Sequence, residues 1–167
     1  AEEYLEMIRL KTAVLLAASL KIGARLGGAS VEDAERLYDF GMHIGVAFQL
    51  KDDFLDVYGN AKVFGKNIGG DILCNKKTYM LIKALEHANA EQRDQLNGWI
   101  NAENFQPAEK IAAVTELYDR IGVKEICEDK MSEYSNRAME SLAAVSLAEE
   151  KKEELKKIIE NLMHREV

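Results

Sequence analysis

Residues 41–56 read GMHIGVAFQLKDDFLD, and this stretch decides the fold and carries most of the chemistry. It contains no proline, and its apolar residues recur at helical spacing. The pattern therefore predicts the centre of one long helix, which begins at Val31 and ends near Tyr58, just before Gly59.

Polar side chains of this helix gather on one stripe. Each helical residue turns by about 100°, which puts three carboxylates within about 60° of Gln49: those of Asp52, Asp53 and Asp56. Gly41 and Gly45 continue the stripe toward the N-terminus. Another arc of the helix is apolar and is expected to be the packing face: Leu37, Ile44, Phe48 and Leu55.

Two interpretations of the stripe are open. Charge runs are usually solvated faces, and three like charges on adjacent turns repel each other. A glycine inside a helix destabilises the helix by about 1 kcal/mol relative to alanine. On a solvated face, the absence of a side chain brings no benefit that would offset this lost stability. A groove that admits a ligand, by contrast, benefits from the absence of side chains at these positions. We therefore interpret the stripe as a ligand groove whose carboxylates suit a hard divalent cation such as Mg²⁺.

Further helical segments follow on both sides of this stretch. Almost half of the 167 residues are Ala, Glu, Lys, Leu or Arg, and there is one proline. Helices are expected over residues 2–26, 76–88, 89–101, 107–121 and 123–145, and over a last segment that Ser146 and Glu149 cap and that ends near His164. The sequence thus predicts an all-α helical bundle that forms a single unit over residues 1–167.

Composition excludes several classes. The net charge of −7 argues against a nucleic-acid surface, which needs a basic excess. The longest apolar run, residues 13–18, is far too short for a transmembrane segment. Two cysteines fit a reducing compartment, so a cytoplasmic location is expected.

Because the chain begins without Met and already in helical register, we expect it to be cut from a longer chain; removal of Met from a short N-terminus is the alternative.

Cationic residues occur at two other places. Lys11 and Thr12 lie inside the most apolar helix, where a lysine either extends to solvent or faces a polar site. Lys66, Lys76 and Lys77 belong to a glycine-bearing loop with Asp71, and an ordinary solvated loop is the plain alternative. The spacing around this loop does not match a P-loop.

Three ordered motifs together resemble the trans-isoprenyl diphosphate synthases, or polyprenyl synthetases. Residues 48–56, FQLKDDFLD, resemble the second aspartate-rich motif of that family. Lys11-Thr12 with the following apolar run resembles its Lys-Thr helix, and residues 64–78 resemble the loop and helix start that follow the aspartates. The resemblance covers roughly residues 3–80 in order and spacing.

The resemblance implies the isoprenoid synthase fold, usually in a homodimer, and condensation of isopentenyl diphosphate with an allylic diphosphate in the presence of Mg²⁺. It implies metal binding by Asp52 and Asp56, with Asp53 in support, and contacts to the diphosphate from Lys11, Lys66 and Lys76. It also implies that Thr12 and Gln49 lie beside the reacting carbons and that Phe48 packs beside isopentenyl diphosphate.

The sequence departs from the family because it holds no second D-D-x-x-D motif. The basic residues that the family uses to bind isopentenyl diphosphate are also absent, as are the positions that set product length. The chain is thus similar to the C-terminal half of such an enzyme, and negligible activity is expected of it alone. A non-catalytic partner subunit, a class I terpene cyclase and a plain structural helical domain are the alternatives. The first is expected to lose aspartates or lysines, and the second usually carries an Asn-Ser-Glu type metal motif, which is absent here.

Overall fold

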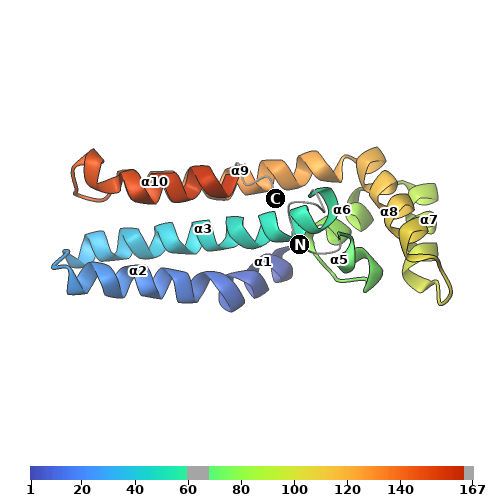
Figure 1. Cartoon of the computed structure of the whole chain (residues 1–167), viewed down its shortest axis with the longest axis horizontal. Helices are drawn as coiled ribbons and strands as arrows, with labels where there is room; N and C mark the ends of the chain where they lie inside the picture. The colour runs from blue at the N-terminus through green and yellow to red at the C-terminus, as the bar shows by residue number, and fades with distance from the viewer. Residues whose placement is uncertain (60–67, 164–167) are drawn as a thin grey trace. The chain divides into compact units, whose positions relative to one another are not determined.

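The computed structural model describes residues 1–59 and 68–163. Within these ranges every regular element is a helix, which confirms the predicted all-α class. In chain order they are α1 (Glu2–Ile8), a π-helical segment (Arg9–Ala13), α2 (Val14–Leu26), α3 (Val31–Tyr58), α5 (Gly70–Leu73), α6 (Tyr79–His87), α7 (Ala90–Asn101), α8 (Pro107–Ile121), α9 (Val123–Ala143) and α10 (Glu149–Met163) (Figure 1). No described helix is long and apolar enough to span a bilayer.

The chain forms two compact units, which we name by their content. Of the described residues, the bundle unit comprises 2–51 and 130–163, and the loop unit is built mainly from 52–59 and 68–129. The helix α3 belongs to the bundle unit up to Lys51 and to the loop unit from Asp52 onward. That residues 1–167 act as a single unit stays a prediction.

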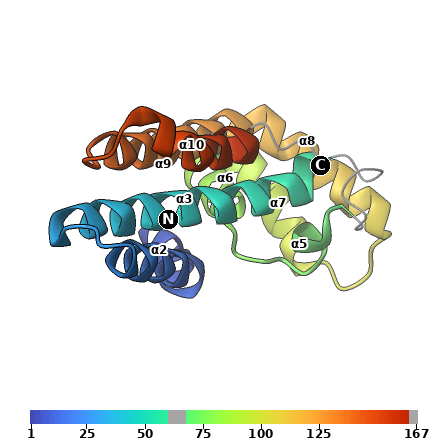
Figure 2. The same ribbon diagram turned by 60° about the vertical axis from the view of Figure 1, so that its left-hand side comes forward.

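In the bundle unit, α2 and α3 lie side by side, and α9 and α10 lie along α3 (Figures 1 and 2). Three buried side chains of α3 pack with buried residues of α9 and α10; the cluster consists of Phe40, Ile44, Ala47, Ala138, Leu142, Ile159 and Leu162. Ile44 and Leu55 are buried, as the predicted packing face requires. Phe48 is 38% exposed, so its place on that face was wrong.

The predicted helix over residues 2–26 contains a π-helical turn that the sequence pattern did not reveal. Buried residues are spaced by four before it, at Tyr4 and Ile8, and by four after it, at Ala13 and Ala17. Across the turn the spacing is five, because a π-turn adds one residue. The π-turn therefore accommodates the extra residue, and the buried face stays continuous along the helix. In purely α-helical geometry, the spacing of five would turn Tyr4 and Ile8 away from the side of the helix that Ala13 and Ala17 occupy.

The two glycines on the stripe of α3 leave room for a neighbouring helical segment and not for a ligand. Our interpretation that their missing side chains form a ligand groove was therefore wrong. A Cβ on Gly41 would lie 2.7 Å from the Cα of Ala17, and one on Gly45 would lie 2.6 Å from the Cα of Ala13. The missing side chains thus allow close backbone contact between α3 and the segment that carries Lys11 and Thr12.

A substitution at Gly45 tests this packing. Gly45→Ala is expected to destabilise the protein by about 1–3 kcal/mol, because its Cβ must displace the backbone of Ala13. Gly23→Ala in α2 is the matched control: its Cβ meets nothing within 4 Å, and alanine should stabilise the helix by up to about 1 kcal/mol. Thermal unfolding of both variants checks the result, and equal shifts would contradict the packing argument.

In the loop unit, α8 packs against α5, α6 and α7. The predicted start of α7 is confirmed by a capping box between Asn89 and Gln92, and Pro107 opens α8 as expected. The segment predicted as helical from residue 76 begins only at Tyr79, because the side chain of Thr78 caps α6.

At the end of the bundle unit, α10 begins at Glu149 and the predicted cap at Ser146 lies outside it. The backbone N–H of Ser146 instead donates to Asp33 Oδ1 at 2.9 Å. This bond links the turn before α10 to the first turn of α3.

Candidate functional site

The bundle unit brings two predicted site residues into contact. Thr12 Oγ1 lies 3.2 Å from Gln49 Oε1 and donates a hydrogen bond to it. Both residues are half-buried, and the close approach at Gly45 brings their helices near enough for this bond. The exposed Lys11 precedes Thr12 on the π-helical turn. Such turns occur often at functional sites, since they present side chains that a regular helix would not.

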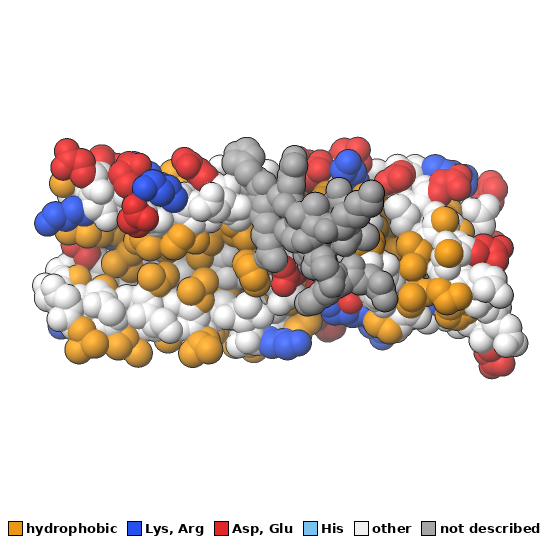
Figure 3. Space-filling view, in the orientation of Figure 1, with side chains coloured by type: hydrophobic (Ala, Val, Ile, Leu, Met, Phe, Trp, Pro, Cys, Tyr) orange, Lys and Arg blue, Asp and Glu red, His pale blue; other side chains and the backbone are white. Residues whose placement is uncertain are grey.

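Phe48 lines an apolar groove of the same unit. The groove has a volume of about 300 Å³, and its walls are formed by Leu16, Ile44, Phe48, Ile158, Asn161 and Leu162. Apolar side chains also gather on the face of this unit that Figure 3 shows. An exposed aromatic residue beside a groove is consistent with a binding role, and the predicted contact of Phe48 with substrate stays a prediction.

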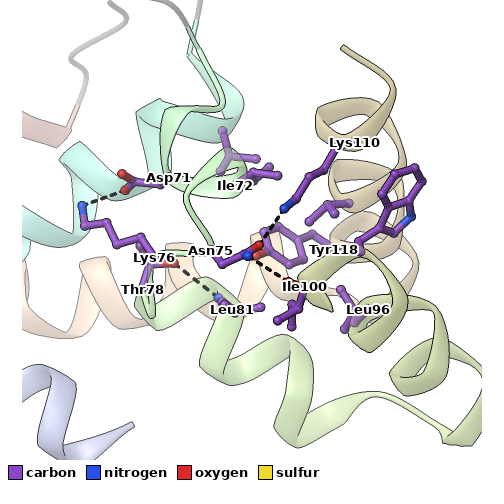
Figure 4. Close-up of a pocket in the computed structure, with 13 residues that line it drawn as sticks. Asp71, Ile72, Asn75, Lys76, Thr78, Leu81, Leu96, Ile100, Lys110 and Tyr118 are labelled. Carbon is purple, nitrogen blue, oxygen red and sulfur yellow. Dashed lines mark hydrogen bonds and ion pairs between the residues drawn. The ribbon is translucent and has the colours of Figure 1, made fainter. Parts of the chain in front are cut away.

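The loop unit contains a cluster of opposite charges around Lys76. Lys76 Nζ lies 3.0 Å from Asp53 Oδ1 and 2.8 Å from Asp71 Oδ2. Asp53 is only 3% exposed, so its carboxylate is removed from solvent, whereas Lys76 is exposed. Figure 4 shows Lys76 extended toward Asp71. We call Asp53, Asp71 and Lys76 the charge cluster.

Asp56 holds the short helix α5 beside this cluster. Its Oδ2 accepts the backbone N–H of Asp71 at 2.8 Å, and its carbonyl oxygen accepts the N–H of Gly69 at 2.6 Å. Gly69 has φ 87°, which favours glycine, and a Cβ there would lie 2.6 Å from the side chain of Ile111. The sequence thus provides both the backbone freedom and the carboxylate that place Asp71 next to Lys76.

Electrostatics in the cluster couple these groups. Burial lowers the pKa of Lys76, but hydrogen bonds to Asp71 and Asp53 outweigh it, so the pKa is raised overall. Burial raises the pKa of Asp71 despite the ion pair with Lys76, and the charges of Asp56 and Asp53 act in the same direction. Lys76 and the two carboxylates are therefore coupled electrostatically, and each group's ionisation affects that of the others.

The carboxylates fit a divalent cation that arrives together with a phosphate ligand. Among the described residues, no group of three or more His, Cys, Asp or Glu forms a preorganised metal site. Mg²⁺ does not require one, because it binds through one or two carboxylates together with waters and substrate phosphates. Metal binding by Asp52, Asp53 and Asp56 stays a prediction, and Lys66 lies outside the described residues.

Sequence reasoning missed part of this arrangement. Asp71 was noted only as a loop residue, and Asn75 and Lys110 were not considered. Lys110 Nζ lies 2.7 Å from Asn75 Oδ1 across 35 positions of the chain. Asp71 lies only five positions before Lys76, and this short spacing could have indicated their ion pair. No local pattern indicates the contact between Asn75 and Lys110, which are 35 positions apart.

Comparisons with known proteins agree with the resemblance. The family model described as "Polyprenyl synthetase" matches residues 1–118. A short chain isoprenyl diphosphate synthase of Methanothermobacter thermautotrophicus is 36% identical over 165 residues, which cover 99% of this chain and 50% of that protein. The chain thus spans about half the length of this curated relative.

Solved structures show the same fold. A crystal structure of a geranylgeranyl pyrophosphate synthase has a TM-score of 0.91 and 35% identity, covering 100% of this chain and 52% of that one. The corresponding enzyme of Corynebacterium glutamicum, complexed with isoprenyl diphosphate and magnesium, has a TM-score of 0.87 and 30% identity, covering 98% and 46% of the two chains. The matched part of each structure is about half of it.

Proposed function

Because this chain belongs to the polyprenyl synthetase family, we propose that it forms part of a trans-prenyltransferase that condenses isopentenyl diphosphate with an allylic diphosphate. The charge cluster is the observation that carries the proposal. Lys76 pairs with buried Asp53 and with Asp71, and Asp56 fixes the backbone beside them. A solvated acidic face would not bury one of its carboxylates or hold its loop in this way.

Each predicted site residue has a role in the proposal. Asp52, Asp53 and Asp56 would hold Mg²⁺, which when bound offsets the negative charge of the departing diphosphate. Three lysines would contact diphosphate oxygens: Lys11, Lys66 and Lys76. Ionisation of the allylic substrate breaks the bond between carbon and diphosphate, and positive groups aimed at the leaving group lower that barrier.

The carbocation requires a different environment. The paired oxygens of Thr12 and Gln49 offer dipoles that stabilise it, and apolar walls such as the one that contains Phe48 exclude water. The double bond of isopentenyl diphosphate then attacks the cation, and the liberated diphosphate takes up the proton that the product loses. A solvent-open site would let water capture the cation instead.

The observations favour this proposal over its alternatives. A partner subunit without catalytic function has no need of intact aspartates and lysines, and a terpene cyclase usually carries a different second metal motif. We further propose a homodimer in the cytoplasm. Several large apolar residues of the bundle unit are exposed, and their burial against another surface would be favourable, which supports association: Met7, Leu10, Leu15, Leu16 and Ile22.

Calorimetric titration with inorganic pyrophosphate tests the proposal on the 167-residue chain. We expect binding when Mg²⁺ is present and its loss when a chelator removes the metal, while orthophosphate at the same concentration binds far more weakly. Turnover of dimethylallyl and isopentenyl diphosphates by this chain alone should be negligible, since its sequence holds a single D-D-x-x-D motif. Pyrophosphate affinity that does not depend on Mg²⁺, or no affinity at all, would contradict the proposed site.

A further inference from the structure

A buried lysine of the loop unit contacts the turn that precedes Lys76. Lys110 of α8 is only 1% exposed, and its Nζ lies 2.7 Å from Asn75 Oδ1 and 4.4 Å from the ring centroid of Phe105. Removing an ammonium group from water is unfavourable, and this burial lowers the pKa of Lys110. A lysine in such a position needs a specific partner, and Asn75 supplies it.

Asn75 adopts a strained backbone conformation. It is the one described non-glycine residue with positive φ, at 53°, in the left-handed region that favours glycine. Both ends of its amide are held. Oδ1 accepts from Lys110, and Nδ2 donates to the carbonyl oxygen of Ile100 at 2.9 Å. Figure 4 shows the side chain of Asn75 directed toward α7 and α8, between these two partners.

This conformation reverses the chain just before Lys76. The backbone N–H of Asn75 donates to the carbonyl oxygen of Ile72 at 3.2 Å, and that of Lys76 donates to the carbonyl oxygen of Asp71 at 2.9 Å. The turn therefore brings Lys76 back over the helix that it follows. Its side chain can then reach both Asp71 and Asp53.

We propose that Lys110 is a positioning residue: its ammonium group holds Asn75 in the left-handed conformation, and this turn directs Lys76 at Asp53 and Asp71. Lys110 acts through Asn75 and does not touch the substrate. The consequence for diphosphate binding rests on the proposed function, whereas the consequence for the position of Lys76 does not.

Chemical labelling of lysines tests the position of Lys76 directly. Reductive methylation requires an amine that is accessible and not held by hydrogen bonds, so release of Lys76 from its two carboxylates speeds its labelling. We expect Lys110→Met to raise the rate at Lys76 about tenfold, read by peptide mass spectrometry. The exposed neighbour Lys77 serves as the internal control, and its rate should change less than twofold.

A rescue experiment separates positioning from general stability. Glycine adopts the left-handed conformation without side-chain support. Lys110→Met combined with Asn75→Gly should therefore return labelling of Lys76 to within about twofold of the original rate. Asn75→Ala, which leaves Lys110 in place, should speed labelling as Lys110→Met does, and Asn75→Gly should not. If Lys110→Met does not fold, the two variants of Asn75 test the inference by themselves. Faster labelling of Lys76 in Asn75→Ala but not in Asn75→Gly supports it, and equal labelling in the two variants contradicts it.

Unchanged labelling of Lys76 in Lys110→Met or Asn75→Ala would overturn the inference, as would failure of glycine to rescue. The affinity for inorganic pyrophosphate with Mg²⁺ supplies the second readout, with an expected loss of about tenfold in Lys110→Met and recovery in the double variant. If the unaltered chain binds no pyrophosphate, the proposed function fails while the labelling result still tests the position of Lys76.

Discussion

Asp52→Ala is expected to slow prenyl transfer by about 10²–10⁴-fold in an active prenyltransferase that contains this chain. Asp52 lies on the same stripe of α3 as Gln49 and is half-buried. Asp53 is nearly inaccessible and pairs with Lys76, and Asp56 accepts hydrogen bonds from the backbone around α5. Loss of the Asp52 carboxylate should therefore remove charge available to Mg²⁺ while leaving in place the contacts that Asp53 and Asp56 make within the loop unit.

Single-turnover kinetics over a range of Mg²⁺ concentrations measure this effect. The variant should need more Mg²⁺ and remain slow at saturation, because the carboxylate is required as charge develops on the leaving group. Asp94→Ala is the matched control, since Asp94 is an exposed aspartate of α7 in the same unit. Rates for Asp52→Ala equal to those of the control would remove Asp52 from the site.

Lys76→Met should both destabilise the loop unit and weaken pyrophosphate binding. Breaking a buried ion pair typically lowers stability by about 3–5 kcal/mol, and we expect about 2–3 kcal/mol here because water screens part of the interaction. The side chain of Lys76 is 45% exposed, while that of Asp53 is 4% exposed. The affinity for inorganic pyrophosphate with Mg²⁺ should fall at least tenfold, since a direct cationic contact is lost.

The pH dependence of this loss has a defined sign. Without the ammonium group, Asp71 loses the opposite charge that favours its ionised form, so its pKa, which burial already raises, rises further. A carboxyl whose pKa is higher in the folded than in the unfolded state favours folding when it is protonated. The stability deficit of Lys76→Met should therefore shrink as the pH falls through the raised pKa of Asp71.

Urea unfolding at several pH values measures this trend, with Lys77→Met as the control. Lys77 is exposed and is the next residue along the chain. Its loss should change stability by less than about 0.5 kcal/mol at every pH. A deficit in Lys76→Met that grows toward low pH would contradict the charge cluster as we describe it.

The sequence allowed accurate prediction where the signals are local. The bounds of α3 and the start of α7 follow from capping residues and apolar spacing within a few positions, and the structure confirms them. The aspartates and Gln49 were placed on one helix for the same reason. The Lys-Thr pair was also identified, although its contact with Gln49 crosses 37 positions.

Other features depend on contacts that no local pattern contains. Helical periodicity placed Gly41 and Gly45 on the stripe, but it could not show that another helix fills the space beside them. The contact between Lys110 and Asn75 depends on how α8 packs against the loop unit. Such pairings are decided by tertiary packing, so their prediction requires the folded chain.

The π-helical turn at Arg9–Ala13 makes the length of this helix a constraint. Deletion of one residue inside the turn would leave a regular α-helix in which Tyr4 and Ile8 keep a spacing of four to Ala13 and Ala17, so the buried face would stay continuous. Insertion of one further residue would instead rotate the preceding segment by about 100° relative to the rest and turn Tyr4 and Ile8 away from the buried face. An insertion at this point of the chain should therefore be tolerated far less than a deletion of one residue.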